Sequence, residues 1–161
     1  MSTLIGNKNN FAIEYSIVQL LPHLMGNIRL WIGGYYVGYY DSPIILGTAA
    51  SELDTIRQSY GEMTIENIKN IDPKDIEKSI YSDESDEINQ NMRSLMLADS
   101  TDDFLLYLYE DGDQLVFFWK LLEDHDLDYP NYDYELHTFP VSKYVYDKIV
   151  KEFSVKIKML R

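Results

Sequence analysis

The stretch DFLLYLYEDGDQLVFFWKLL, residues 103–122, contains two nearly continuous apolar and aromatic runs on either side of EDGD. The Asp111-Gly112 pair between such runs is a strong signal of a β-hairpin, because tight hairpin turns need residues that adopt positive φ. Strands that are apolar at almost every position are typical of sheets covered on both faces. The stretch therefore predicts a hairpin at the centre of a sheet.

Further strands are predicted on both sides of this hairpin. Residues 11–18 place alternate side chains on one face, which is the pattern of a strand. In NIRLWIGGYYVGYYD, residues 27–41, two aromatic runs flank a Gly33-Gly34 pair, which predicts a second hairpin. Gly38 within the second run indicates a bulge or a close approach of another backbone.

The C-terminal third predicts one more strand and a helix. YELHTFPV, residues 134–141, resembles a strand that stops at Pro140, because proline cannot donate a hydrogen bond to a neighbouring strand. In residues 141–153 apolar side chains recur every four positions, which predicts a helix. The residues after 153 fit either a helical stripe or an alternating strand, and the helix is favoured.

The region between the two hairpins predicts helices. Residues 48–60 have helical spacing and a Ser or Thr available as the N-cap. Residues 61–99 are polar, acidic and weakly periodic, so we expect short helices joined by mobile loops. One helix begins with Asp72 as its cap and Pro73 in its first turn. Another covers residues 85–97, where Ile88, Met92, Leu95 and Met96 have helical spacing.

These elements predict an α+β fold. We expect a mainly antiparallel sheet of about five or six strands with helices packed on it, because hairpin connections dominate. The 161 residues form a single domain on this interpretation, residues 1–161, with a mobile acidic segment at 61–99.

Charge is the most unusual property of the composition. The formal net charge is −13, and residues 99–135 carry twelve acidic side chains against Lys120 alone. Such a field repels nucleic acid and anionic membranes and attracts a basic protein partner. The N-terminus has no basic region and no apolar core of the kind found in signal peptides, and no apolar run has the length of a membrane span. These observations predict a cytoplasmic protein, a location that the complete lack of cysteine also suits.

The most acidic stretch is EDHDLDYPNYDYE, residues 123–135. Asp124, Asp126, Asp128 and Glu135 match positions 1, 3, 5 and 12 of an EF-hand calcium loop. The position where that loop needs glycine is Tyr129, and the predicted flanks are strands where an EF-hand has helices. A noncanonical calcium loop stays open as an alternative, beside a solvated acidic loop and a loop that binds another protein.

No pattern in the sequence indicates catalysis. The three histidines lie apart, and no phosphate-binding loop, dinucleotide-binding loop or nucleophile elbow is present. We therefore expect no enzyme, no catalytic residue, no metal and no cofactor. A small hydrolase without a recognisable motif ranks last among the hypotheses.

Residues 5–41 carry a resemblance to a known family. LIGNKNNFAIEY, residues 4–15, contains an Ile-Gly pair ahead of Phe-Ala-Ile-Glu, and GNIRLWIGGYYVGYYD, residues 26–41, contains a Trp-Ile hairpin that ends in a glycine. This pattern resembles the bacterial immunity protein 42 family. The SELDTI stretch and the hairpin of residues 103–122 are similar to the later part of its pattern. Asn7, Tyr39-Tyr40 and the acidic segment 61–99 depart from it.

The resemblance implies a cytoplasmic protein of polymorphic-toxin and contact-dependent inhibition systems that binds one cognate toxin and blocks it. It transfers no catalytic residue. Many such toxins are nucleases with basic clefts, so an acidic, tyrosine-rich inhibitor surface is physically sensible. The hypothesis is that the toxin C-terminal domain binds the acidic stretch, with Tyr129 and Tyr132 as anchors. The predicted partner-binding residues are Glu123, Asp124, Asp126, Asp128, Tyr129, Tyr132, Asp133 and Glu135.

Overall fold

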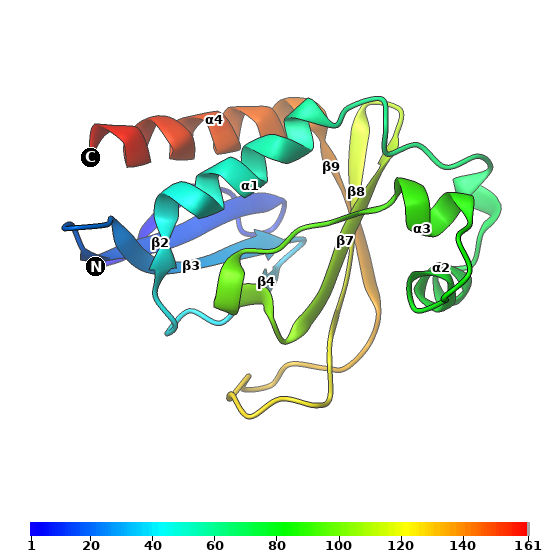
Figure 1. The fold of residues 1–161 in the computed structure, drawn as a ribbon, viewed down its shortest axis with the longest axis horizontal. Coiled ribbons are helices and arrows are strands. Elements are labelled where there is room, and N and C mark those ends of the chain that lie inside the picture. The colour runs from blue at the N-terminus through cyan, green and yellow to red at the C-terminus, as the bar shows by residue number, and fades with distance from the viewer. Residues whose placement is uncertain (161) are drawn as a thin grey trace.

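A computed structural model describes residues 1–160, which form two antiparallel sheets and four α-helices (Figure 1). The first sheet contains β1 (Thr3–Gly6), β2 (Phe11–Gln19), β3 (Met25–Ile32), β4 (Tyr35–Val37) and β5 (Ile44–Ile45). The second contains β6 (Arg93–Ser94), β7 (Phe104–Asp111), β8 (Gln114–Leu121) and β9 (His137–Ser142). The helices are α1 (Leu46–Gln58), α2 (Pro73–Ile80), α3 (Glu87–Asn91) and α4 (Lys143–Met159), with 3-10 turns at Ile68–Asn70 and Ala98–Thr101. The α+β class and the antiparallel pairing are confirmed, but the strands divide between two sheets where the sequence predicted one.

The hairpin of residues 103–122 lies at the centre of the second sheet, as predicted. Its register runs from Phe104 opposite Leu121 to Asp111 opposite Gln114, and Gly112 in the turn has φ +60°. Because side chains alternate along a strand, this hairpin contributes to two separate clusters of buried residues. One face joins the cluster shared with the first sheet, and the other face packs against the segment that contains α2 and α3.

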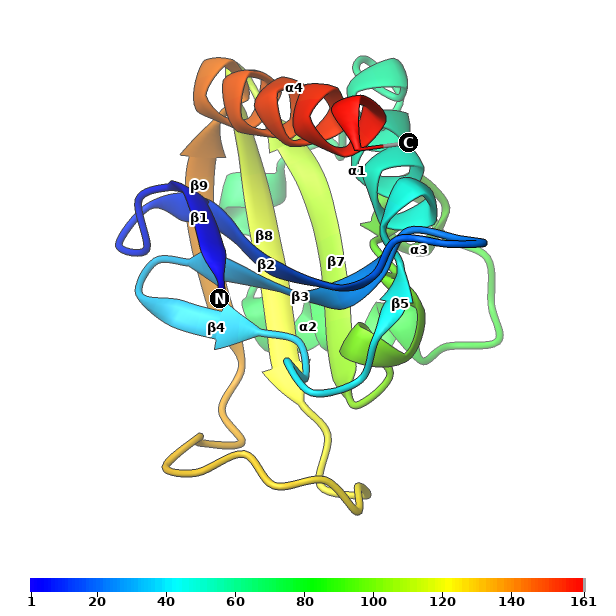
Figure 2. The same ribbon diagram turned by 90° about the vertical axis from the view of Figure 1, so that its left-hand side faces the viewer.

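The strands of the two sheets run crosswise (Figure 2). Helices α1 and α4 lie side by side along the first sheet and at the upper end of the second sheet (Figures 1 and 2). Phe11 of β2 stacks on Phe117 of β8 with ring centroids 5.5 Å apart, and both rings pack against Tyr146 of α4. The hydroxyl of Tyr146 donates to the carbonyl oxygen of Leu53 in α1, at 2.6 Å. One apolar core therefore holds both sheets and both long helices.

The hairpin around Gly33-Gly34 is confirmed, with φ of +57° and +90° at the two glycines. Its second strand, predicted near residues 35–40, ends at Val37. Gly38 has φ +121°, and a Cβ there would lie 2.6 Å from the hydroxyl oxygen of buried Ser100. The chain turns at this close approach, and the amide of Tyr39 donates to the carbonyl of Ser100 instead of to a strand.

Three predictions about helix and strand ends were wrong. Strand β9 runs through Pro140, because the strand pairs only with β8 and so lies at an edge of its sheet, where a missing donor is tolerated. Helix α1 has Ile45 as its N-cap, and no side chain caps it. The helix predicted at residues 85–97 ends at Asn91, because Arg93 and Ser94 pair with β7.

The segment of residues 61–99 covers the outer face of the second sheet. Asp72 accepts from the amide of Lys74 and Pro73 begins α2, as predicted. Ile76 of α2 is 1% exposed in the second cluster, together with Phe118 of β8. Within residues 1–160, no helix combines the length and the apolar character needed to cross a lipid bilayer.

Candidate functional site

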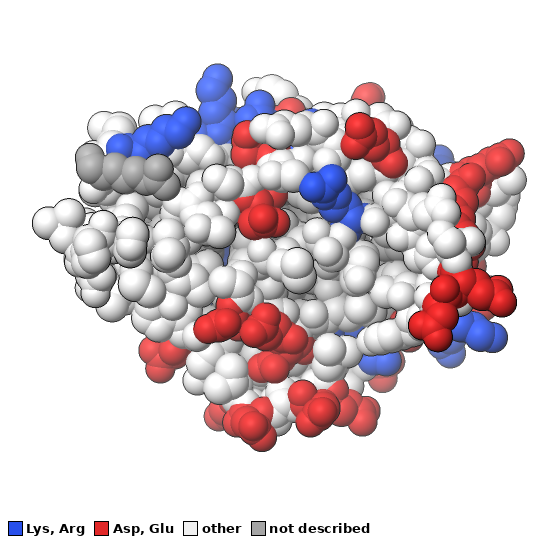
Figure 3. All heavy atoms as spheres, viewed as in Figure 1, with Lys and Arg blue, Asp and Glu red and all other residues white. Residues whose placement is uncertain are grey.

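The acidic stretch of residues 123–135, hereafter the acidic loop, connects β8 to β9 and extends away from both sheets (Figures 1 and 2). Five of its carboxylates are exposed to solvent: Glu123, Asp124, Asp126, Asp128 and Glu135. Red side chains accordingly gather along the lower edge of the molecule in Figure 3, where the loop lies in Figure 1. The loop thus presents a dense negative surface at one end of the protein.

Tyr129 fastens the middle of the acidic loop to the body of the protein. It is 7% exposed, and its hydroxyl donates to the carboxylate of Asp103 at 2.8 Å. Its ring packs edge-on against Phe104 and Tyr39. Burial and the neighbouring Asp103 carboxylate raise the pKa of this phenol, which therefore stays protonated and continues to donate.

Tyr132 makes the second attachment. The indole nitrogen of Trp119 donates to its hydroxyl oxygen at 3.1 Å. Its ring packs against Phe104 of the second sheet and Tyr36 of the first sheet. Burial raises the pKa of this tyrosine as well, although the indole hydrogen bond acts in the opposite direction. The sequence hypothesis placed Tyr129 and Tyr132 outward as anchors for a partner, whereas in the structure Tyr129 is buried, Tyr132 is half-buried, and both hold the loop.

Asp133 forms a small polar network where the acidic loop joins β9. One carboxylate oxygen contacts His137 Nε2 at 2.6 Å and accepts from the amide of Glu135 at 3.0 Å. The hydroxyl of Tyr35 donates to the other oxygen at 3.5 Å. Burial raises the pKa of Asp133, but these hydrogen bonds, with that of His137 the strongest, hold it below its ordinary value. Asp133 therefore serves the shape of the loop more than its exposed surface.

His125 also shapes the acidic loop, a role that the sequence did not indicate. Its Nδ1 lies 2.7 Å from the carbonyl oxygen of Leu127, and its Nε2 lies 3.1 Å from the hydroxyl of Tyr134. Its ring also packs edge-on against Tyr129. Only the three-dimensional contact with Tyr134 reveals this bridge, because the two residues are nine positions apart in an irregular loop.

The alternating aspartates do not form an ion cage in the structure. Among residues 1–160, no three His, Asp or Glu side chains are grouped so that they could hold a metal ion. The four residues that match the calcium template are all exposed to solvent. They lie on a loop whose position is set by Tyr129 and Tyr132 and not by an ion. The geometry gives the calcium hypothesis no support.

A second acidic surface covers α2 and α3, at the right of Figure 3. Several of its carboxylates have structural roles, because Asp86 caps α3 and accepts from Ser79, and Glu77 pairs with Lys120 at 3.1 Å. The remaining exposed carboxylates of this surface include Asp75, Asp83 and Glu84. Two separate acidic regions therefore exist, of which the acidic loop is the more protruding.

Comparison with protein families adds one match, to the model of immunity protein 42, over residues 1–156. The chain belongs to the immunity protein 42 family. Comparison with curated proteins and with solved structures gave no match. Immunity proteins neutralise toxins by binding a cognate toxin protein, and they are typically not enzymes.

The sequence motifs that resembled this immunity family are structural in the protein. Glu14 of the Phe-Ala-Ile-Glu motif is 8% exposed and accepts from Arg29 Nε at 2.8 Å and from the indole nitrogen of Trp31 at 2.7 Å. Burial raises the pKa of Glu14, but these two donors together hold it below its ordinary value. Gly26 faces the carbonyl oxygen of Ser16 so closely that no Cβ fits there. The motif residues of the family thus build the first sheet, and the acidic loop lies outside them.

Proposed function

We propose that this immunity protein binds and neutralises a basic toxin domain in the bacterial cytoplasm through the carboxylates of its acidic loop. Toxin neutralisation in general follows from family membership. The positive charge of the toxin, the surface that meets it and the compartment are the proposal. A nuclease is the favoured toxin class, because a protein that holds nucleic acid uses a basic cleft that complements an acidic inhibitor.

One observation carries this proposal: the acidic loop displays exposed carboxylates on a frame that is already ordered. Tyr129 and Tyr132 pack against Phe104 of the second sheet and against Tyr39 and Tyr36, respectively, and His125 bridges Leu127 and Tyr134 within the loop. A surface that is ordered before binding loses little conformational entropy when a partner arrives. Charges arranged in this way also speed the encounter with a basic protein.

The contacts assign different roles to the residues of the acidic loop. Glu123, Asp124, Asp126, Asp128 and Glu135 are proposed to meet basic side chains of the toxin. Tyr134 is 44% exposed and is the tyrosine of this loop that is placed to touch a partner. Tyr129, Tyr132 and Asp133 are proposed to act indirectly, because they hold the loop in position.

Charge reversal tests the proposal. The triple variant Asp124→Lys, Asp126→Lys, Asp128→Lys should associate with the toxin domain encoded by the neighbouring gene about tenfold or more slowly at low salt. It should also lose protection in a growth assay with that toxin. Stopped-flow fluorescence across a range of salt concentrations measures the association rate.

A matched control separates the acidic loop from net charge. The variant Asp75→Lys, Asp83→Lys, Glu84→Lys changes the net charge by the same amount on the second acidic surface. It should bind and protect almost as the parent protein does. Equal loss in the two triple variants would show that only overall charge matters, and full protection by the loop variant would place the toxin elsewhere.

A further inference from the structure

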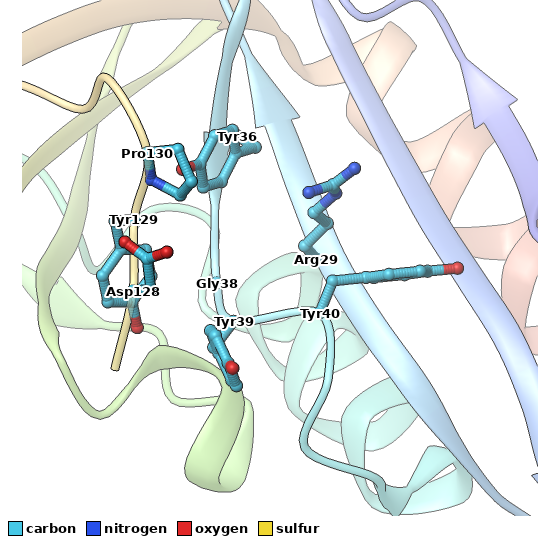
Figure 4. Close-up of a pocket in the computed structure, with 8 residues that line it drawn as sticks. All are labelled: Arg29, Tyr36, Gly38, Tyr39, Tyr40, Asp128, Tyr129 and Pro130. Carbon is cyan, nitrogen blue, oxygen red and sulfur yellow. The ribbon is translucent and has the colours of Figure 1, made fainter. Parts of the chain in front are cut away.

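A pocket of about 300 Å³ lies at the foot of the acidic loop, between that loop and the chain that follows β4 (Figure 4). Arg29 and Tyr40 lie on one side of it, and Asp128, Tyr129 and Pro130 lie on the opposite side. Tyr36 and Tyr39 close the space between them. The pocket is therefore an aromatic socket with a carboxylate at its rim, and its size suits one long side chain.

Arg29 already has a counter-ion. Its Nε donates to Glu14 at 2.8 Å, and Glu14 is almost completely buried. Its guanidinium also lies over three aromatic rings, with distances of 5.0 Å to Trp31, 5.1 Å to Tyr36 and 4.8 Å to Tyr40. Arg29 thus builds one wall of the pocket, and Glu14 balances its positive charge there in part.

Asp128 supplies the charge that an occupant meets. It is exposed, and no hydrogen bond or ion pair with any other residue of the described range 1–160 satisfies its carboxylate. Its negative charge reaches the pocket: burial raises the pKa of Tyr36, Arg29 lowers it by the next largest effect, and Asp128 raises it by a smaller one. An anion would be repelled by this carboxylate, whereas a cation would find both a counter-ion and aromatic faces.

We propose that this pocket receives one lysine or arginine side chain of the toxin. The methylene stem packs against Tyr36 and Tyr39, and the charged end pairs with Asp128. Contacts between a cation and aromatic rings add to the ion pair when water is partly excluded. The identity of this occupant rests on the proposed function, but the preference of the pocket for a cationic side chain is a property of this chain alone.

Small peptides test the pocket without the toxin. Acetyl-Gly-Gly-Lys-Gly-Gly-amide should shift the NMR signals of the Gly38 and Tyr39 amides in a saturable way at millimolar concentration. The matched peptides with Gln or Glu in the central position should leave these signals unchanged. Shifts caused equally by the Gln peptide, or by the Glu peptide alone, would overturn the assignment.

Two neutral substitutions in the same loop provide the matched comparison. Asp128→Asn should weaken binding of the Lys peptide about fivefold, the value of a partly exposed ion pair. Asp126→Asn removes the same charge from an exposed position outside the pocket and should weaken binding much less. Equal effects of the two substitutions would show that the peptide responds to the overall negative charge of the loop and not to the pocket. Unchanged NMR spectra away from the loop establish that both variants are folded.

The outcome for the toxin is independent of the outcome for the peptides. If the Lys peptide fills the pocket but the triple charge reversal leaves toxin binding intact, the pocket stands and the proposed interface fails. If the triple variant loses the toxin while the Lys peptide leaves Gly38 and Tyr39 undisturbed, the interface stands and the pocket is wrong. If Asp128→Asn also dissociates from the toxin about fivefold faster than Asp126→Asn does, the pocket is part of the toxin interface.

Discussion

Glu110 is a buried acidic residue with a structural role, in contrast to the exposed carboxylates of the acidic loop. It is 4% exposed near the end of β7 and accepts from Lys143 at 2.7 Å. The backbone amides of Gly61 and Met63 also donate to it, at 2.8 and 3.0 Å. One carboxylate therefore links the hairpin, the start of α4 and the segment that leads away from α1. Burial raises the pKa of Glu110, but these donors together hold it below its ordinary value.

The Glu110→Gln variant should lose about 2–4 kcal/mol of unfolding free energy at neutral pH, because it leaves a partly buried lysine and two amides with a weaker acceptor. The folded-state pKa of Glu110 is lowered, so its contribution is complete above the ordinary glutamate pKa and disappears as the pH falls through the folded value. The difference between variant and parent should therefore shrink below about pH 4.5. Urea unfolding from pH 3 to pH 7 measures it.

Glu77→Gln is the matched control. Glu77 of α2 pairs with Lys120 of β8, in the same sheet as Glu110, and this pair is more exposed than the pair of Glu110 and Lys143. This change should cost about 0–1 kcal/mol at neutral pH. An equal loss in both variants, or a loss from Glu110→Gln that is the same at pH 3 and pH 7, would contradict the role assigned to Glu110.

At the scale of elements, Gly38 ends β4 and allows the first sheet to meet the turn that contains Ser100. Ser100 is completely buried, and its hydroxyl donates to the carbonyl oxygen of Ile28 at 2.7 Å. A side chain at position 38 would collide with that hydroxyl oxygen. The contact explains why the second aromatic run becomes a turn instead of a longer strand.

Gly38→Ala should lower the unfolding free energy by about 2–4 kcal/mol, because left-handed backbone strain and overpacking add together. Gly61→Ala is the matched comparison, since Gly61 has φ +91° and no atom within 4 Å of the added Cβ. It should cost only about 1–2 kcal/mol of backbone strain. Thermal unfolding compares the two variants, and equal losses would show that the contact with Ser100 is unimportant.

The elements that the sequence predicted well are those that local chemistry determines. Asp111-Gly112 and Gly33-Gly34 specify tight turns through their own φ preferences, and Asp72-Pro73 specifies a helix start. Elements that depend on distant partners were predicted less well. Met92 and Leu95 have helical spacing, yet the amide of Leu95 donates to Leu106 and the chain is extended there. The division into two sheets has the same cause, because no local pattern records which strands pair.

The candidate site was predictable in its charge but not in its support. The exposed carboxylates of residues 123–135 follow from their density in an irregular stretch. The burial of Tyr129 depends on Tyr39 and Asp103, which lie far away in the sequence. The pocket beside Asp128 needs Arg29 from the first sheet, so no reading of the loop alone could have found it.

At the scale of the whole molecule, the second sheet divides the apolar interior into two clusters of buried residues. The larger cluster joins both sheets with α1 and α4, and the smaller lies between the second sheet and α2. The backbone of the outer segment joins the sheet at its two ends, through Met63 and Glu110 and through β6 and β7. The outer segment should therefore open more easily than the strands beneath it.

Ile76→Ala tests this division. It should lower the free energy of opening for amides in residues 65–92 by about 2–4 kcal/mol and leave those of β2 and β3 near their parent values. Leu53→Ala removes a similar side chain from the larger cluster and should lower protection throughout the protein. Native-state hydrogen exchange measures both variants. Uniform loss of protection in Ile76→Ala would mean that the chain opens as one unit.

The attachment of the acidic loop by its tyrosines separates the residues that give the loop its shape from those that give it its charge. Tyr129 is buried and Tyr132 is half-buried, whereas the exposed carboxylates of Glu123, Asp124, Asp126 and Glu135 form no hydrogen bond or ion pair within residues 1–160. The outward residues of the loop can therefore be substituted with little effect on folding, provided that the residues that hold its shape remain. Under the proposed function, a few substitutions at these outward positions would change the toxin that the protein recognises without altering its fold.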